Sequence, residues 1–238
     1  MSLRDLARRV PGMRRTYRFA YDLMLRMKSE ERVFTDIYRG KKWLGSESVS
    51  GLGSDPSQTR IVSLAIPKLI AEFGIKSLHD IPCGDFFWMS RVELERVEYF
   101  GSDIVAELIE GNNAAHSRPH VHFAQANLLE GSLRKVDLMF VRDCLVHFSY
   151  QDIFTALKNI AKSESTYLLS TTFPDRTRNT DIPTGRWRPI NLEISPFNLP
   201  TPMRTINEGC TEAGGAFADK SLALWRVDDI RNALRLPG

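Results

Sequence analysis

The pattern of apolar and polar residues between positions 61 and 173 alternates between two periods. Apolar runs of strand length lie at 76–81, 97–104, 121–129, 136–143 and 165–173. The segments that carry apolar residues at helical spacing are 61–75, 106–116 and 150–163. Strands that alternate with helices in this way are typical of a parallel, doubly wound sheet. We therefore predict an α/β fold with a Rossmann-like, mostly parallel sheet.

After residue 173 the periodic pattern stops. The segment 174–202 contains six prolines, and an irregular segment of this length is usually a functional lid or a linker. Its apolar residues, such as Ile190 and Phe197, favour an ordered, packed loop, which we assign to the substrate. The runs 203–209 and 220–227 then predict an antiparallel strand pair that completes a seven-stranded sheet.

Composition excludes several classes of protein. The chain has 238 residues, of which 42% are apolar and 26% charged, as in globular domains. No stretch approaches the roughly 20 apolar residues of a membrane span, and the N-terminus lacks the apolar run of a secretory signal. Three widely spaced cysteines exclude a disulfide framework and fit a reducing compartment. These features indicate a cytoplasmic protein.

Charge is distributed unevenly along the chain. Residues 1–45 hold twelve basic and five acidic side chains, a net of +7, so the rest carries −4 of the total of +3. We predict a basic helical extension over 1–42, broken at Pro11–Gly12, followed by a catalytic domain over 43–238. A basic arm binds phosphate groups, so peripheral contact with an anionic membrane at its inner face is one interpretation. A solvated helix face is the other.

Candidate ligand-binding residues follow the predicted strands. In doubly wound sheets, ligands bind beyond the carboxyl ends of the strands. Gly84 lets the backbone approach a ligand closely, and Asp103, nineteen residues later, can accept hydrogen bonds from two ribose hydroxyls. The pair predicts a ligand that contains adenosine. A dinucleotide fingerprint needs three glycines, and here Pro82, Gly84 and Phe87 stand at those places. This favours S-adenosylmethionine over NAD.

The order of the motifs DIPCGDFFW, YFGSDIV, FAQANLL and DLMFVRDCLVHFS resembles that of class I S-adenosylmethionine-dependent methyltransferases over roughly residues 43–230. The flanking segments SESVSGLGSDPSQTR and NTDIPTGRWRPINLEISPFNLPTP look like those of a bacterial branch that methylates sugars or other small hydroxylated metabolites. The resemblance therefore implies a methyltransferase fold and S-adenosylmethionine as cofactor.

The resemblance also implies roles for individual residues. Asp80 matches the acid that orients the first loop, Asp103 the ribose acid, and Leu128 the residue packed on adenine. Asn127 stands where an aspartate usually accepts from the adenine amine, and its amide oxygen can replace that acceptor only without charge. Pro82 replaces a glycine of the family pattern. The full expected cofactor set is Asp80, Pro82, Cys83, Gly84, Asp103, Ile104, Asn127, Leu128 and Arg142.

Two candidate bases follow the fourth predicted strand. On a helix that starts near Asp143, the spacing of four places Asp143 and His147 on one face. Histidine has the better pKa for proton abstraction near neutral pH, while Asp143 could hold the substrate hydroxyl, orient His147 or bind a divalent cation. A structural role for His147 is the alternative. No spacing rule enforces a metal site, so we favour metal-independent chemistry.

Aromatic and basic residues flank the predicted cofactor site. Tryptophan faces stack on sugars, and arginine grips carboxylate or phosphate. The expected substrate set is Trp43, Arg60, Arg186, Trp187, Arg188 and Asn191.

The sequence hypothesis is thus O-methylation of a sugar or glycoconjugate hydroxyl. Alternatives are another small molecule, a nucleic acid, an NAD-type oxidoreductase and a catalytically silent cofactor-binding fold. Nucleic acid is disfavoured, because enzymes that methylate base amines tend to carry Asn/Asp-Pro-Pro-aromatic where this chain has residues 142–145.

Overall fold

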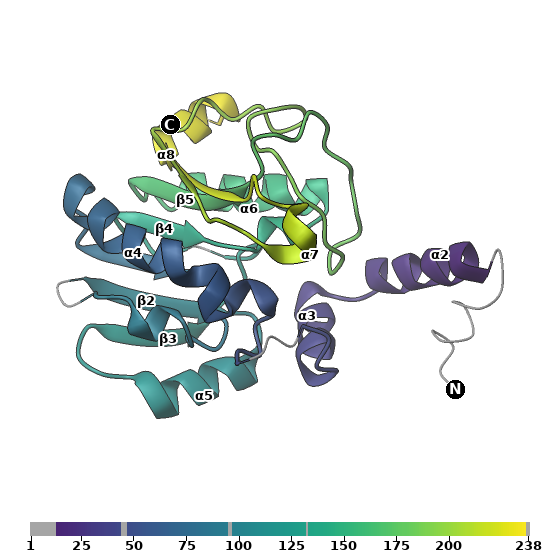
Figure 1. The fold of residues 1–238 in the computed structure, drawn as a ribbon, viewed down its shortest axis with the longest axis horizontal. Helices are drawn as coiled ribbons and strands as arrows, with labels where there is room; N and C mark the ends of the chain where they lie inside the picture. Colours follow the sequence, from purple (N-terminus) through teal and green to yellow (C-terminus); the bar gives the residue numbers. More distant parts are fainter. Residues whose placement is uncertain (1–12, 44–46, 95–96, 132, 237–238) are drawn as a thin grey trace.

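The computed structural model describes residues 13–43, 47–94, 97–131 and 133–236 (Figure 1). The strands are β1 (Ser77–Asp80), β2 (Glu98–Asp103), β3 (Val121–Gln125), β4 (Leu138–Val141), β5 (Tyr167–Thr172), β6 (Arg204–Asn207) and β7 (Ser221–Arg226). The helices are α2 (Met13–Arg26), α3 (Glu30–Arg39), α4 (Pro56–Phe73), α5 (Ala106–His116), α6 (Tyr150–Lys162), α7 (Glu212–Gly215) and α8 (Val227–Ala233). Short 3-10 turns are η1 (Leu52–Ser54), η2 (Met89–Arg91) and η3 (Leu145–His147).

The seven strands form one sheet in the order β3-β2-β1-β4-β5-β7-β6. The first five strands are parallel, and β7 runs antiparallel to both β5 and β6. The predicted doubly wound sheet with a C-terminal antiparallel pair is confirmed. Because β1 lies between β2 and β4, the chain reverses its direction of winding there, and Asp80 at the end of β1 pairs with Gly101 and Phe140. Ligands bind at such a reversal in open α/β sheets.

Both faces of the sheet are covered. Along β4, Leu138 and Phe140 enter one apolar cluster with α4 and α5, whereas Met139 and Val141 enter a second cluster with α6 and α8. Successive side chains of a strand point to opposite faces, so a strand covered on both sides is apolar throughout. This explains why β4 reads as an unbroken apolar run.

Local signals set where the elements begin and end. Helix α4 begins at Pro56, earlier than its apolar period suggests, and stops at Gly74, whose φ of 63° lies in the left-handed region. The third strand ends at Gln125 rather than at residue 129. It stops there because the side chain of Asn127 accepts a hydrogen bond from the Leu129 N–H and turns the chain.

The N-terminal arm packs against the proline-rich segment. Leu25, Val33 and Ile37 of α2 and α3 form a third apolar cluster, and a Cβ at Gly185 would lie 2.4 Å from Val33 Cγ1. The predicted break at residues 11–12 lies outside the described residues. Within 174–202 the chain forms neither helix nor strand, yet Ile190 and Leu192 are fully buried, so the segment is packed as expected. None of the helices described is long and apolar enough to cross a membrane.

Candidate active site

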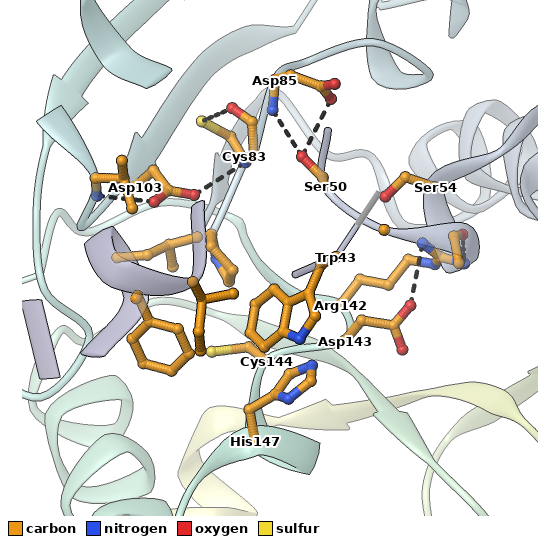
Figure 2. Close-up of a pocket in the computed structure, with 18 of the residues that line it drawn as sticks. Trp43, Ser50, Ser54, Cys83, Asp85, Asp103, Arg142, Asp143, Cys144 and His147 are labelled. Atoms are coloured by element: carbon orange, nitrogen blue, oxygen red, sulfur yellow. Dashed lines mark hydrogen bonds and ion pairs between the residues drawn. The ribbon is translucent and has the colours of Figure 1, made fainter. Parts of the chain in front are cut away.

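A cavity of about 480 Å³ lies at the carboxyl ends of β1, β2 and β4 (Figure 2). The ends of these strands supply one wall. Helix α3, Trp43 and the segment 49–54 supply a second wall, and Trp187, Phe217 and Lys220 a third. All nine residues expected to bind the cofactor line this cavity, from Asp80 to Arg142. The parallel topology brings them together, because the carboxyl ends of parallel strands share one edge.

Asp103 connects the end of β2 to the loop after β1. Its carboxylate accepts hydrogen bonds from the Gly84 N–H at 3.1 Å and the Val105 N–H at 2.9 Å. Gly84 has φ of +56°, and a Cβ there would lie 2.3 Å from Ser50 Oγ, so only glycine fits. A carboxylate offers about four acceptor positions, so Asp103 keeps acceptor capacity for a ligand. Burial raises the pKa of Asp103 to about 6.

Asp80 is the second buried carboxylate of the cavity. It accepts a hydrogen bond from the Tyr99 hydroxyl at 2.7 Å. Burial raises the pKa of Asp80 to about 7, although this hydrogen bond and the positive charge of Arg142 oppose the shift. Neither Asp80 nor Asp103 forms an ion pair with any residue that the structure describes. Neither carboxylate is therefore neutralised by an ion pair with the described residues, and a positively charged ligand would offset the cost of ionising them.

Asn127 lies at the opposite end of the cofactor wall. Its side-chain oxygen accepts from the Leu129 N–H at 3.0 Å. The amide NH₂ of Asn127 has no hydrogen-bond partner among the described residues, so it can donate to a ligand, and the second lone pair of the amide oxygen can still accept. The expectation that the amide oxygen receives the adenine amine stays a prediction. Leu128 is buried beside it and lines the cavity.

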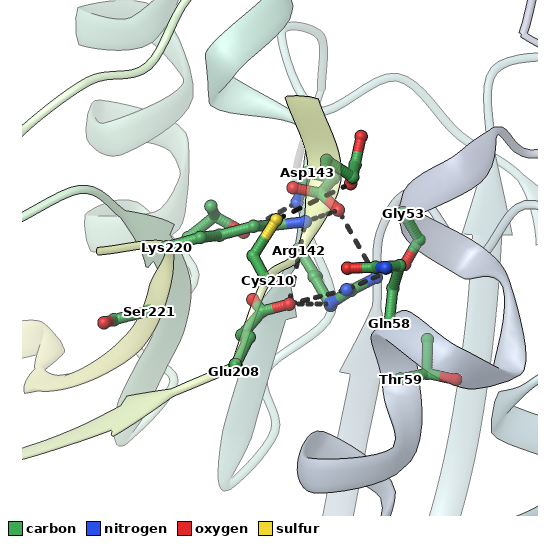
Figure 3. Close-up of polar contacts among 12 residues, drawn as sticks. Gly53, Gln58, Thr59, Arg142, Asp143, Glu208, Cys210, Lys220 and Ser221 are labelled. Carbon is green, nitrogen blue, oxygen red and sulfur yellow. Dashed lines mark hydrogen bonds and ion pairs between the residues drawn. The ribbon is translucent and has the colours of Figure 1, made fainter. Parts of the chain in front are cut away.

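Four charged side chains form a compensated cluster at the other end of the cavity (Figure 3). Arg142 donates to Glu208 at 2.6 and 3.1 Å and to the Gly53 carbonyl at 2.9 Å. Lys220 Nζ lies 2.6 Å from Asp143 Oδ2 and 3.6 Å from Glu208 Oε2. Arg142 was expected to bind the cofactor, yet its guanidinium is already held by these protein acceptors.

Asp143 presents one free oxygen to the cavity. Burial alone would raise the pKa of Asp143, but Lys220 and Arg142 outweigh it and lower the pKa. Both cations contact Oδ2, and Oδ1 accepts no hydrogen bond within the described part of the chain. The side chain is 28% exposed, so an ionised oxygen remains available to a ligand.

His147 lies beside Trp43, with ring centroids 4.2 Å apart (Figure 2). Its Nδ1 contacts the Arg186 carbonyl oxygen at 2.8 Å. A carbonyl oxygen only accepts, so Nδ1 carries the proton and Nε2 keeps its lone pair. Burial lowers the pKa of His147 to about 4, which keeps the ring neutral at pH 7.

The predicted helix that begins near Asp143 is wrong. Asp143 has φ of +52°, and the chain forms only the 3-10 turn η3 before Ser149 caps α6. A left-handed residue cannot continue an α-helix, so the spacing of four does not place Asp143 and His147 on one helix face. The structure instead brings both to the cavity through this turn.

The predicted substrate residues divide into two groups. Trp43 and Trp187 line the cavity, and Trp187 is 42% exposed. Arg60, Arg186, Arg188 and Asn191 do not line it. The structure shows Arg60 exposed on α4 and Arg186 bound to Asp22 at 2.7 Å. We therefore leave these four residues out of the acceptor site.

Arg188 and Asn191 hold the proline-rich segment in place. The guanidinium of Arg188 donates to the carbonyls of Leu145 and Phe148 at 2.8 and 2.7 Å. The amide of Asn191 donates to two carbonyls of residues 174–176. Sequence reasoning missed this outcome, because a buried arginine that satisfies backbone carbonyls has the same local pattern as one that faces a ligand.

The sequence also gave no signal for a polar clasp over the first loop. Asp85 accepts hydrogen bonds from Ser48 Oγ at 2.9 Å and from the Val49 N–H at 2.9 Å. Its own N–H donates to Ser50 Oγ at 3.0 Å. These hydrogen bonds hold residues 48–50 against the first loop, where Val49 and Ser50 line the cavity. Glu208 and Lys220 were missed as well, since they directly follow β6 and directly precede β7, far along the chain from Arg142 and Asp143.

No protein-family model and no curated protein matches this sequence. Among solved structures, N-methyltransferase NodS from Bradyrhizobium japonicum WM9, in complex with S-adenosyl-L-homocysteine, is similar with a TM-score of 0.58 and 17% identity; the match covers 80% of this chain and 98% of NodS. The fold is that of class I methyltransferases. Magnesium protoporphyrin IX methyltransferase from Synechocystis PCC 6803, with bound SAM, is similar with a TM-score of 0.56 and 15% identity, over 84% and 97% of the two chains.

Human N-acetylserotonin methyltransferase, in complex with SAM, has the same methyltransferase fold. It matches with a TM-score of 0.55 and 12% identity, over 84% of this chain and 60% of its own. These solved relatives act on different acceptors according to their names, so the shared fold leaves the acceptor of this chain to be argued from its own residues.

Proposed function

We propose that this protein binds S-adenosylmethionine and transfers its methyl group to an acceptor. The observation that carries the proposal is the pair of buried carboxylates, Asp80 and Asp103, that line the cavity without an ion pair to any described residue. S-adenosylmethionine carries an ammonium and a sulfonium charge together with two ribose hydroxyls, and this chemistry complements the two acids. The solved methyltransferases with bound SAM or S-adenosylhomocysteine support the same choice.

The residues that would hold the cofactor follow from the free groups of the cavity. Asp103 retains acceptor positions for the ribose hydroxyls, and Gly84 permits close approach of the loop. Leu128 offers an apolar surface to adenine, and the Asn127 NH₂ can donate to an adenine ring nitrogen. Asp80 is the acid left for the positively charged methionine end.

Calorimetry tests this assignment with S-adenosylmethionine, S-adenosylhomocysteine and NAD. We expect S-adenosylmethionine to bind and Asp103→Ala to lose about 1.5–3 kcal/mol of binding free energy, since two charge-assisted hydrogen bonds disappear. Asp228→Ala, which removes an exposed carboxylate on α8, is the matched control. Unchanged affinity in Asp103→Ala, or tighter binding of NAD, would contradict the proposal and favour the oxidoreductase alternative.

For the acceptor we propose a hydroxyl group of a sugar or glycoconjugate. Trp43 and Trp187 offer aromatic faces to the cavity, which suit the C–H surface of a sugar ring. The ionised Oδ1 of Asp143 can accept a hydrogen bond from a second hydroxyl of the sugar, next to the reacting one, and so orient the ring. S-adenosylmethionine, when bound, supplies an electrophilic methyl group. The proton of the reacting hydroxyl would pass to Nε2 of His147 and then to solvent.

Methyl transfer to a panel of nucleotide-sugars, glycans, small amines and nucleic acid tests the acceptor class. With the best acceptor, we expect His147→Ala to lower turnover about 10²–10⁴-fold while S-adenosylhomocysteine binds as before, because a positioned base contributes this much. His122→Ala, an exposed histidine on β3, is the control. Transfer only to nucleic acid or amines would reject the hydroxyl proposal. Full turnover per folded molecule in His147→Ala would make His147 structural.

A further inference from the structure

Helix α2 has two faces with different surroundings. Its inner face touches the proline-rich segment. Asp22 accepts a hydrogen bond from the Arg186 guanidinium at 2.7 Å, and the same guanidinium lies 4.5 Å from the centre of the Tyr21 ring. Leu25 is buried with Val33 of α3. Figure 1 shows the rest of α2 extending away from the sheet. The inner face thus fixes the helix, and its other side faces outward.

The outward face of α2 is apolar. Phe19 and Leu23 of α2, and Met27 in the turn directly after its end, follow one another at four-residue spacing and are 71%, 51% and 81% exposed. Tyr17 and Met24 widen this surface and are also exposed. Residues four apart lie above one another on a helix, so the side chains form one continuous stripe. Scattered exposed apolar residues need no explanation, whereas a contiguous stripe indicates a contact surface.

Basic side chains border the apolar stripe. Helix α2 contains four arginines and a single acid, Asp22, and this acid is already paired with Arg186. Arg15, Arg18 and Arg26 are exposed. An apolar face with Phe and Leu beside an arginine-rich face is the composition of helices that lie in a lipid interface.

Charge decides between the two occupants that an apolar helix face could take. A second copy of the chain would bring its own arm, with a net charge of +7 over residues 1–45, against an arm of the same charge. Like charges oppose that association, whereas an anionic bilayer attracts basic segments by about 1 kcal/mol for each arginine or lysine near its surface. The charge of the arm therefore favours lipid over self-association.

We propose that α2 docks on the surface of an anionic lipid bilayer through the stripe formed by Tyr17, Phe19, Leu23, Met24 and Met27. This function goes beyond methyl transfer and does not depend on it. Arg186 links the docked helix to the cavity, because its side chain holds Asp22 and its carbonyl accepts from His147. Docking would therefore hold the cavity next to the lipid surface.

Vesicle flotation of the full chain tests the proposal. One set of vesicles contains phosphatidylcholine alone, and the other also contains about 30% phosphatidylglycerol, to represent an anionic leaflet. We expect binding to the anionic vesicles that weakens with salt. The triple variant Phe19→Gln, Leu23→Gln, Met27→Gln keeps helix-forming residues and should lower the partition coefficient at least about ten-fold. Leu64→Gln removes a comparably exposed apolar residue from α4 and is the matched control.

Two results would overturn the proposal. One is equal binding of the wild type and the triple variant, or an equal loss in Leu64→Gln, since the stripe would then have no special role. The other is absence of vesicle binding together with a dimer, measured by light scattering, that the triple variant abolishes; this would assign the stripe to a second copy. Circular dichroism and S-adenosylmethionine binding of each variant show that the body of the protein is unchanged.

Discussion

The cavity has two acidic ends that differ in how their charge is balanced. At one end, Asp80 and Asp103 are buried with hydrogen-bond donors but form no ion pair within the described part of the chain, and burial raises the pKa of both. At the other end, Asp143 lies against Lys220 and Arg142, which lower its pKa. The same residue type therefore has opposite electrostatic surroundings within one cavity.

This difference suggests that one end of the cavity binds a ligand, whereas the other end stabilises the fold. Two cations and two acids balance at the Asp143 end, where Arg142 joins β4 to Glu208 and to the Gly53 carbonyl. The charges of this cluster are thus balanced by the protein's own side chains. Acids that stay without a cation cost stability, and a fold retains them where a ligand supplies the missing charge. The difference between the two ends therefore supports the proposal that Asp80 and Asp103 bind the cofactor and that the free oxygen of Asp143 binds the acceptor.

Removal of a cation should turn the balanced end into an unbalanced one. Lys220→Met leaves two acids facing Arg142 alone, and we expect the free energy of unfolding to fall by about 3–5 kcal/mol, as for broken buried ion pairs. Urea unfolding measures the loss. The double variant Lys220→Met, Asp143→Asn restores neutrality and should be more stable than the single variant. If it is less stable, charge balance does not hold this cluster together.

Neutralising an acid at the Asp80 end should instead raise the free energy of unfolding. The Asp80 carboxyl ionises near 3.8 in the unfolded chain and near 7 in the folded one, so the folded state binds the proton more tightly between these values. The stability of the wild type therefore falls as pH rises from about 4 to about 7. Without ligand at pH 8, we expect Asp80→Asn to be more stable on the order of 2–4 kcal/mol.

Chemical unfolding of both proteins between pH 4 and 8 measures this difference. The gap between the two curves should open through that range and vanish at the acid end. The same variant should bind S-adenosylmethionine more weakly, although it is more stable. Parallel curves, or an Asn variant that is less stable at pH 8, would mean that Asp80 is already compensated within the protein.

A smaller effect is expected where the balanced cluster meets η1. A Cβ at Gly53 would lie 2.9 Å from Asp143 Oδ2 and 3.3 Å from Lys220 Nζ. Gly53→Ala should therefore cost about 1–2 kcal/mol of stability through overpacking. Gly111→Ala in α5, where nothing lies within 4 Å, should instead stabilise by about 0.5–1 kcal/mol. Thermal unfolding of the two variants measures whether stability falls in Gly53→Ala and rises in Gly111→Ala. Unchanged stability in Gly53→Ala would show that the Asp143–Lys220 ion pair can move to make room for the methyl group.

Much of the fold and half of the candidate site could be predicted from the sequence. Asp80, Asp103 and Asn127 follow apolar runs, and the rule that parallel strands end at one edge brings them together in the structure. The helix assigned to Asp143 failed for a local reason, since a positive φ in an aspartate gives no periodic signal. The expectation that Arg188 faces the substrate missed its structural contacts for a non-local reason, because the carbonyls that accept from its guanidinium lie about 40 residues away in the sequence.

The sequence by itself determined the order of strands and helices, and which acids stand at the strand ends. Hydrophobic period and turn residues act over a few positions, so they can be read along the chain. Only the tertiary structure decided which of those acids is neutralised, since Glu208 and Lys220 lie 66 and 77 residues from their partners. Burial and the distance to an opposite charge set the state of a carboxylate, and both depend on segments that meet only when the sheet closes.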